Sequence, residues 1–109
     1  MQITQILANL VAEALESAQA TGALPAAGEV EIKIERPKLT EHGDFSTSLP
    51  LTLVRTMRVP PIQIAAAIVD AMPQHEMIGS TASAPPGFVN FTLSMHWLQS
   101  QVNIVRSLG

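Results

Sequence analysis

Three side chains near the end of the sequence combine an aromatic ring, an amide and a hydroxyl at alternating positions. Within the stretch Phe88–Leu93, an alternation of period two places Phe88, Asn90 and Thr92 on one face of a strand and the apolar residues on the other. A ring can stack on an unpaired base, and an amide can both donate to and accept from a base edge. One alternative stays open, in which a helix or loop covers Phe88 and Asn90 hydrogen-bonds to nearby backbone.

The most distinctive polar stretch is Glu41–Thr47. Its structural interpretation is a turn in which Gly43 takes a positive φ and Asp44 hydrogen-bonds to the backbone of the turn that follows. Its functional interpretation is a polar surface beside a strand end, where His42, Gly43 and Asp44 are available to a ligand or partner. His42 and Asp44 could supply two metal ligands, but a third would have to come from a distant segment. Helix-end histidines and capping aspartates are common, so we expect no metal site and disfavour a metal-dependent enzyme.

The motifs that carry common catalytic and nucleotide-binding chemistry are absent from the sequence. It contains no P-loop, no G-x-G-x-x-G, no H-E-x-x-H and no G-x-S-x-G. The lack of cysteine excludes disulfides, thiolate metal sites and thiol catalysis. We therefore expect neither a catalytic residue nor a cofactor in this chain.

The charge balance limits how the chain could bind nucleic acid. Six basic and nine acidic residues give a formal net charge of −3. Proteins that bind nucleic acid mainly by neutralising phosphates are usually basic. A chain of this charge that binds nucleic acid must read a local feature and take part of its affinity from elsewhere.

The bulk composition predicts one folded domain over residues 1–109. A chain of 109 residues with 47% hydrophobic side chains can build one core. Its uninterrupted apolar runs are only a few residues long, and its first residues lack the basic start of a signal peptide. We expect a cytoplasmic protein that does not interact with a membrane.

Apolar residues at spacings of three and four predict several helices. The first stripe covers residues 3–18 and ends at Gly22, and another covers residues 62–72. Ser94 can cap a last helix. The apolar positions of that helix are Leu98, Val102, Val105 and Leu108.

A further helix is predicted between two prolines. Residues 37–47 read as a long loop, and Pro50 limits where a helix can begin, because proline is tolerated only in the first turn. A helix that is capped by Thr47 or Ser48 and runs to about Arg58 satisfies this constraint.

Three strands complete the predicted fold. Residues 29–35 alternate strictly between apolar and charged side chains, which predicts a half-buried strand. A weaker strand at residues 78–84 precedes the clear strand at 88–93. Residues 85–87 suit a type II turn between them, with Gly87 at its third position. The order α-β-α-α-β-β-α predicts an α+β fold, in which a small antiparallel sheet packs against about four helices on one side.

Several segments in their order and spacing carry a resemblance to a known family. They are Ile34–Lys38, Glu41–Thr47, Ile62–Met72, Pro86–Leu93 and Trp97-Leu98. From about residue 30 to residue 98, the sequence resembles the N-terminal domain of arginyl-tRNA synthetases.

The resemblance implies an additional domain, ahead of a class I catalytic core, that contacts the corner of its tRNA near the D-loop. Matched by position to the G-[FY]-x-N-F strand of that family, Asn90 would hydrogen-bond the edge of a flipped-out D-loop base, and Phe88 would stack on or flank it. The implied partners are tRNA and the rest of the synthetase chain, with no DNA. ATP and Mg²⁺ are expected for the parent enzyme.

The sequence departs from the family pattern in places. Ser48 stands where asparagine is frequent and Pro50 where a small helix former is usual, which would shift the start of that helix. Leu93 and Met95 offer no polar group that could assist base reading. The chain ends at Gly109, before the ATP-binding signature of a synthetase, so we expect an excised recognition domain. The alternative is a free-standing protein-interaction module of the same fold without ligase activity.

Overall fold

The predicted order of helices and strands is present in the computed structural model, which describes residues 3–37 and 43–100. The elements are α1 (Ile3–Thr21), β1 (Phe45–Thr47), α2 (Leu49–Met57), α3 (Pro61–Ala71), β2 (Ile78–Ala84) and β3 (Phe88–Leu93). Residues 95–100 begin a further helix. The predicted α+β class is therefore confirmed, although one predicted strand lies in a different segment.

Helices α1 and α3 follow the apolar spacing of the sequence. The buried residues of α1 are Leu7, Leu10, Val11, Ala14, Leu15 and Ala18. Gly22 follows this helix with a φ of 87°, as expected for a residue that ends a helix. In α3, Ile64, Ala65 and Ile68 point into the core.

Helix α2 begins where its proline requires. Ser48 is its N-cap residue, Pro50 lies in the first turn, and the Thr47 hydroxyl accepts a hydrogen bond from the Leu49 N–H at 3.2 Å. The helix ends at Arg58, which adopts a φ of 57° while its N–H donates to the Val54 carbonyl. The predicted start and end are therefore confirmed within one residue.

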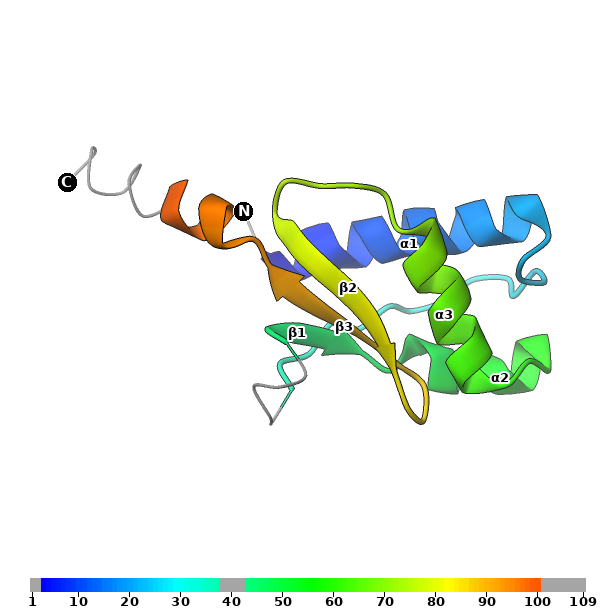
Figure 1. Ribbon diagram of the computed structural model, residues 1–109. Coiled ribbons are helices and arrows are strands. Elements are labelled where there is room, and N and C mark those ends of the chain that lie inside the picture. The colour runs from blue at the N-terminus through cyan, green and yellow to red at the C-terminus, as the bar shows by residue number, and fades with distance from the viewer. Residues whose placement is uncertain (1–2, 38–42, 101–109) are drawn as a thin grey trace.

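The sheet is antiparallel, with strand order β1-β3-β2, so β3 is the central strand. Figure 1 shows the helices α1, α2 and α3 gathered on one side of this sheet. Val89 and Phe91 of β3 are completely buried against them. The alternate side chains of β3 must therefore point to the opposite face.

The predicted strand at residues 29–35 is wrong in one respect. Val30, Ile32 and Ile34 pack against the core and their neighbours are exposed, as the alternation predicts. However, the segment makes only one bridge to the sheet, where Glu35 and Ser46 exchange two backbone hydrogen bonds of 2.8 Å. Beyond this bridge β1 turns into α2, so residues 29–34 have no strand beside them to pair with.

The first strand of the sheet lies instead in the predicted loop. Residues 45–47 form β1, with Phe45, Ser46 and Thr47 opposite Phe91, Asn90 and Val89 of β3. All three β1 residues are buried. A strand of three buried residues shows no alternation between buried and exposed positions, which is why the sequence pattern did not reveal it.

The hairpin turn between β2 and β3 is not the predicted type II turn. Gly87 lacks the positive φ that the third position of such a turn requires. The glycine is needed for another reason. A Cβ atom at this position would lie 2.5 Å from Cβ of Pro61 and 3.1 Å from a methyl carbon of Leu51, so only glycine lets the hairpin approach α2 and α3.

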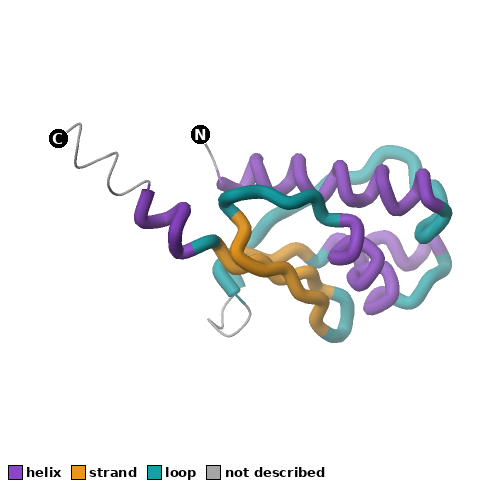
Figure 2. The backbone as a smooth tube through the Cα atoms, turned by 45° about the horizontal axis from the view of Figure 1, so that its top comes forward, coloured by secondary structure: helices purple, strands orange, loops and turns teal. Residues whose placement is uncertain are grey.

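The last helix begins as predicted. The Ser94 hydroxyl accepts a hydrogen bond from the Trp97 N–H at 3.3 Å, and Trp97 and Leu98 pack against the core. Residues 95–100 lead away from the other helices (Figure 2). The remaining predicted apolar positions, Val102, Val105 and Leu108, lie outside the described residues. In the parts of the chain that the structure describes, no helix combines the length and apolar character needed to cross a membrane.

Residues 29–34 do not pair with a neighbouring strand, and this predicts that their backbone amides exchange rapidly with solvent. Since Val30 and Ile32 make no backbone hydrogen bond to another described residue, we expect their amides to exchange at least about 100-fold faster than those of Val89 and Phe91. Hydrogen exchange followed by NMR measures this difference. Protection of Val30 and Ile32 equal to that of the β3 amides would mean that the segment is a paired strand after all.

Candidate functional site

The open face of β3 borders a pocket of about 350 Å³. Phe88 and Asn90 are half-buried and line it, whereas Thr92 on the same face is exposed and lies outside it. The full lining is Glu35, Arg36, Pro37, Ser46, Ala84, Pro85, Phe88 and Asn90. The structure thus brings the two residues singled out from the sequence to one concave surface.

Strand pairing orders the polar groups of this pocket in a row. Glu35 lies opposite Ser46, Ser46 lies opposite Asn90, and Asn90 lies opposite Ala82. Directly paired residues share a face of the sheet, with Cβ atoms about 4.5–5.5 Å apart. A carboxylate, a hydroxyl and an amide therefore lie side by side, with the Phe88 ring two residues along β3 from the amide.

This arrangement suits a flat polar ligand. Phe88 offers a partly exposed ring for stacking, and the Asn90 side chain makes no hydrogen bond to another described residue. Among the described residues, the Phe88 ring is covered only in part and the Asn90 amide is not bonded to nearby backbone. Both side chains can therefore contact a ligand without losing an interaction within the described part of the fold.

The loop residues Gly43 and Asp44 hold β1 against β3. Gly43 has the predicted positive φ, at 88°, and a Cβ atom there would lie 2.7 Å from the carbonyl oxygen of Phe91. Asp44 donates its N–H to the same carbonyl at 2.8 Å, and its carboxylate accepts from the N–H of Leu93 at 2.8 Å. The predicted bond to the following turn is therefore wrong, because the partner lies on a distant strand.

The loop does not join the pocket in the described part of the chain. Neither Gly43 nor Asp44 is among the lining residues, and His42 lies outside the described residues. Over residues 3–37 and 43–100, the structure has no group of three or more side chains that could hold a metal ion. The Asp44 carboxylate is instead engaged by a backbone N–H.

Sequence reasoning missed the residues that segment 35–37 and β1 contribute to the pocket. The sequence pattern predicts that Glu35 lies on the solvent-exposed face of a strand and that Ser46 lies in a polar loop, but it does not bring the two residues together. Arg36 places its guanidinium carbon 5.4 Å from the centroid of the Phe45 ring, within the range of a cation–π contact. For these residues the sequence pattern gives one signal, which is the position of Glu35 at the end of an alternating run. The position of Ser46 opposite Asn90 becomes visible only in the folded structure.

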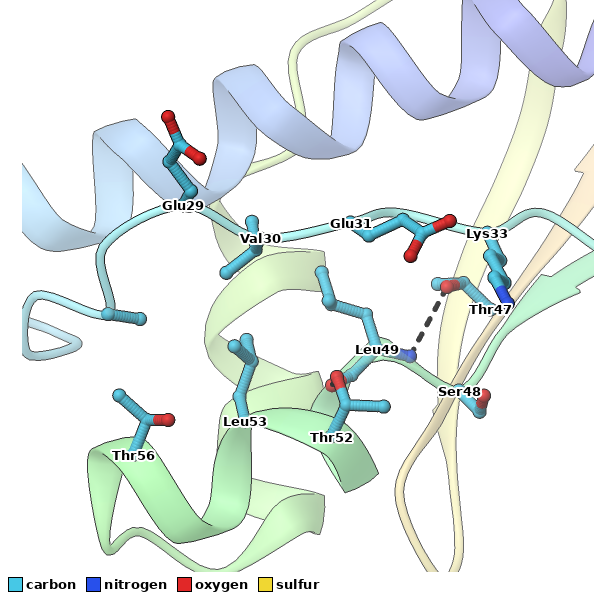
Figure 3. A pocket seen from close by; sticks show the side chains of 11 residues that line it. Glu29, Val30, Glu31, Lys33, Thr47, Ser48, Leu49, Thr52, Leu53 and Thr56 are labelled. Atoms are coloured by element: carbon cyan, nitrogen blue, oxygen red, sulfur yellow. Dashed lines mark hydrogen bonds between the residues drawn. The ribbon is translucent and has the colours of Figure 1, made fainter.

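A second pocket, of about 320 Å³, lies between residues 29–33 and α2 (Figure 3). Glu29, Glu31 and Lys33 line one wall, and the hydroxyls of Thr52 and Thr56 lie on the other. This lining includes no aromatic ring and none of the residues predicted to form a site. The pocket beside β3 is therefore the better candidate for binding a planar group.

Comparisons with known proteins agree on one family. The family model described as "Arginyl tRNA synthetase N terminal domain" matches residues 5–93. The chain is 41% identical over 96 residues to an arginine–tRNA ligase of Idiomarina loihiensis, covering 88% of this chain and 17% of that protein. It is 36% identical over 105 residues to an arginine–tRNA ligase of Dehalococcoides mccartyi, covering 96% of this chain and 19% of the relative. The chain thus spans less than one fifth of the length of these curated relatives.

Solved structures give the same result for the fold. The arginyl-tRNA synthetase of Thermus thermophilus matches with a TM-score of 0.72 and 25% identity, over 92% of this chain and 15% of that one. The arginyl-tRNA synthetase of Plasmodium falciparum matches with a TM-score of 0.73 at 13% identity, over 90% of this chain and 17% of that one, which is a likeness of fold alone.

The crowding at Gly43 predicts a large cost for any side chain there. Gly22 and Gly43 have nearly the same φ, 87° and 88°. A Cβ atom added at Gly22 would have no other atom within 4 Å, whereas one added at Gly43 would lie 2.7 Å from the carbonyl oxygen of Phe91. We expect Gly22→Ala to lower the free energy of unfolding by about 1–2 kcal/mol, the usual cost of a left-handed residue. Gly43→Ala should cost at least about 1 kcal/mol more, because Cβ collides with the Phe91 carbonyl. Urea denaturation of both variants measures the difference, and equal costs would show that β1 is not held this closely.

Proposed function

The chain belongs to the family of arginyl-tRNA synthetase N-terminal domains, and we propose that its open sheet face reads an unpaired base in the D-loop of the tRNA that the parent synthetase charges. Asn90 would hydrogen-bond the edge of this base. Phe88 would stack on its ring or flank it. The observation that carries the proposal is the pocket beside β3, where both side chains are accessible and adjacent.

The chemistry of the pocket supports a base rather than a phosphate as the recognised group. Its wall contains one acidic and one basic residue, Glu35 and Arg36, and the whole chain carries a net charge of −3. Phosphate recognition would favour a cluster of cations, whereas an aromatic ring with an amide suits an unstacked base. The affinity for the rest of the tRNA would come from other parts of the parent synthetase.

The same proposal covers the cellular role. The domain would contribute to arginylation in the cytoplasm by helping to select the tRNA, without reacting with it. ATP and Mg²⁺ would act in the catalytic part of the parent enzyme. The loop with His42, Gly43 and Asp44 would serve the site indirectly, because Gly43 and Asp44 hold β1 in register beside Asn90.

Substitutions in a full-length synthetase that contains this domain test the proposal. Asn90→Ala should lower kcat/KM for arginylation by roughly 5- to 150-fold, because a lost base contact costs about 1–3 kcal/mol. Phe88→Ala should have an effect of similar size, since stacking on an aromatic ring contributes about 1–3 kcal/mol per base. Thr92→Ala is the matched control, because it lies on the same face of β3 but outside the pocket.

Base deletion in the tRNA identifies the partner of these residues. Transcripts in which single unpaired D-loop bases are replaced by abasic nucleotides should include one that wild-type enzyme charges more slowly. With Asn90→Ala enzyme, the difference in charging between that transcript and the intact one should be smaller than with wild-type enzyme, because the Asn90 contact is already lost while the Phe88 contact remains. Wild-type rates for both Asn90→Ala and Phe88→Ala, with unchanged thermal stability, would contradict the proposal.

A further inference from the structure

Ser46 is deeply buried, and its hydroxyl has no hydrogen-bond partner among the described residues. The residue is only 8% exposed and lines the pocket beside β3. Its hydroxyl makes no hydrogen bond to any other residue in the described part of the chain. Among those residues, however, no fully buried side-chain oxygen or nitrogen lacks a partner. This agrees with a Ser46 oxygen that faces the pocket, which the residue lines.

Ser46 lies between two other polar residues that line the same pocket. Its partner on β3 is Asn90, and its partner on the other side is Glu35. Two backbone hydrogen bonds of 2.8 Å between Glu35 and Ser46 fix this end of the row. The three side chains therefore have a defined order across the sheet, and each of them lines the pocket.

Given the base-reading role proposed above, we infer that Ser46 is a further ligand-contacting residue and that Glu35, Ser46 and Asn90 together bind one edge of the unpaired nucleobase. The carboxylate of Glu35 only accepts hydrogen bonds, the hydroxyl donates or accepts, and the amide does both. The bound edge must therefore present an N–H donor to the end of the row at Glu35. Glu35 is exposed, so an edge with acceptors alone at this end would be disfavoured mainly by repulsion from the carboxylate.

Substitution of Ser46 can separate direct contact with the base from a purely structural role. If Ser46 had only a structural role, Ser46→Ala would leave tRNA charging unaltered, whatever its effect on stability. If its hydroxyl binds the base, removing the oxygen weakens tRNA recognition and leaves the fold intact. Ser46→Ala distinguishes these cases, because it keeps Cβ and removes only the oxygen.

The test is arginylation by a full-length synthetase that contains this domain, with its own tRNA as the probe. Ser46→Ala should lower kcat/KM about 3- to 10-fold, the range for one hydrogen bond between neutral groups. Glu35→Gln, which keeps the size of the side chain, should also lower it at least about 3-fold. Ser80→Ala is the matched control, because Ser80 pairs with Thr92 on the same face of the sheet and lies outside this pocket. Thermal denaturation of each variant should give a Tm within about 2 °C of wild type, because none of these side chains makes a hydrogen bond to another described residue.

A double-mutant cycle of Ser46→Ala with Asn90→Ala completes the test. Two residues that bind the same base should give a combined loss smaller than the product of the single losses. If Asn90→Ala lowers kcat/KM but Ser46→Ala and Glu35→Gln do not, the row is wrong and the proposed function stands. If Asn90→Ala, Phe88→Ala and Ser46→Ala all leave charging unchanged, both the row and the proposed function are wrong. A lowered Tm with unchanged charging for Ser46→Ala would assign Ser46 to the fold alone.

Discussion

The complete burial of Val89 and Phe91 against the helices determines which side chains of the sheet can meet a ligand. Successive residues of a strand point to opposite faces, so placing these two in the core leaves Phe88, Asn90 and Thr92 on the other side. A shift of one residue would bury the amide and expose two large apolar side chains, which burial free energy opposes strongly. The accessible face of β3 is therefore as firmly fixed as the core itself.

A second constraint decides what lies next to that face. The short strand β1 has only three residues, and its position depends on Gly43 and Asp44, which lie against Phe91 and Leu93 at the far end of β3. This attachment places Ser46 opposite Asn90. The bridge at Glu35 then extends the row by one residue. Residues that do not line the pocket thus control its hydrogen-bonding pattern.

The acidic charge of the chain is compatible with a recognition role of this kind. A net charge of −3 gives little general attraction to a phosphate backbone, so binding of the whole tRNA would depend on other parts of the parent synthetase. What this domain would add is discrimination, because the buried Ser46 hydroxyl and the half-buried Asn90 amide would lose their partners on a wrong base. The chain belongs to the family of arginyl-tRNA synthetase N-terminal domains and spans 17% and 19% of two curated relatives.

The sequence by itself determined the helices, the strands at residues 78–84 and 88–93, and the placement of Phe88 and Asn90 on the same face of a strand. These features follow from local periodicity and from the positions of proline and glycine. The sequence pattern misassigned residues 29–35, since alternation reports burial on one side and not hydrogen bonding to a neighbouring strand. Only the tertiary structure decided that residues 45–47 form a strand, that Asp44 bonds to Leu93, 49 residues away, and that Glu35 and Ser46 lie beside Asn90. Each of these contacts joins segments far apart in the chain, and a local sequence pattern carries no information about which distant backbone groups it will meet.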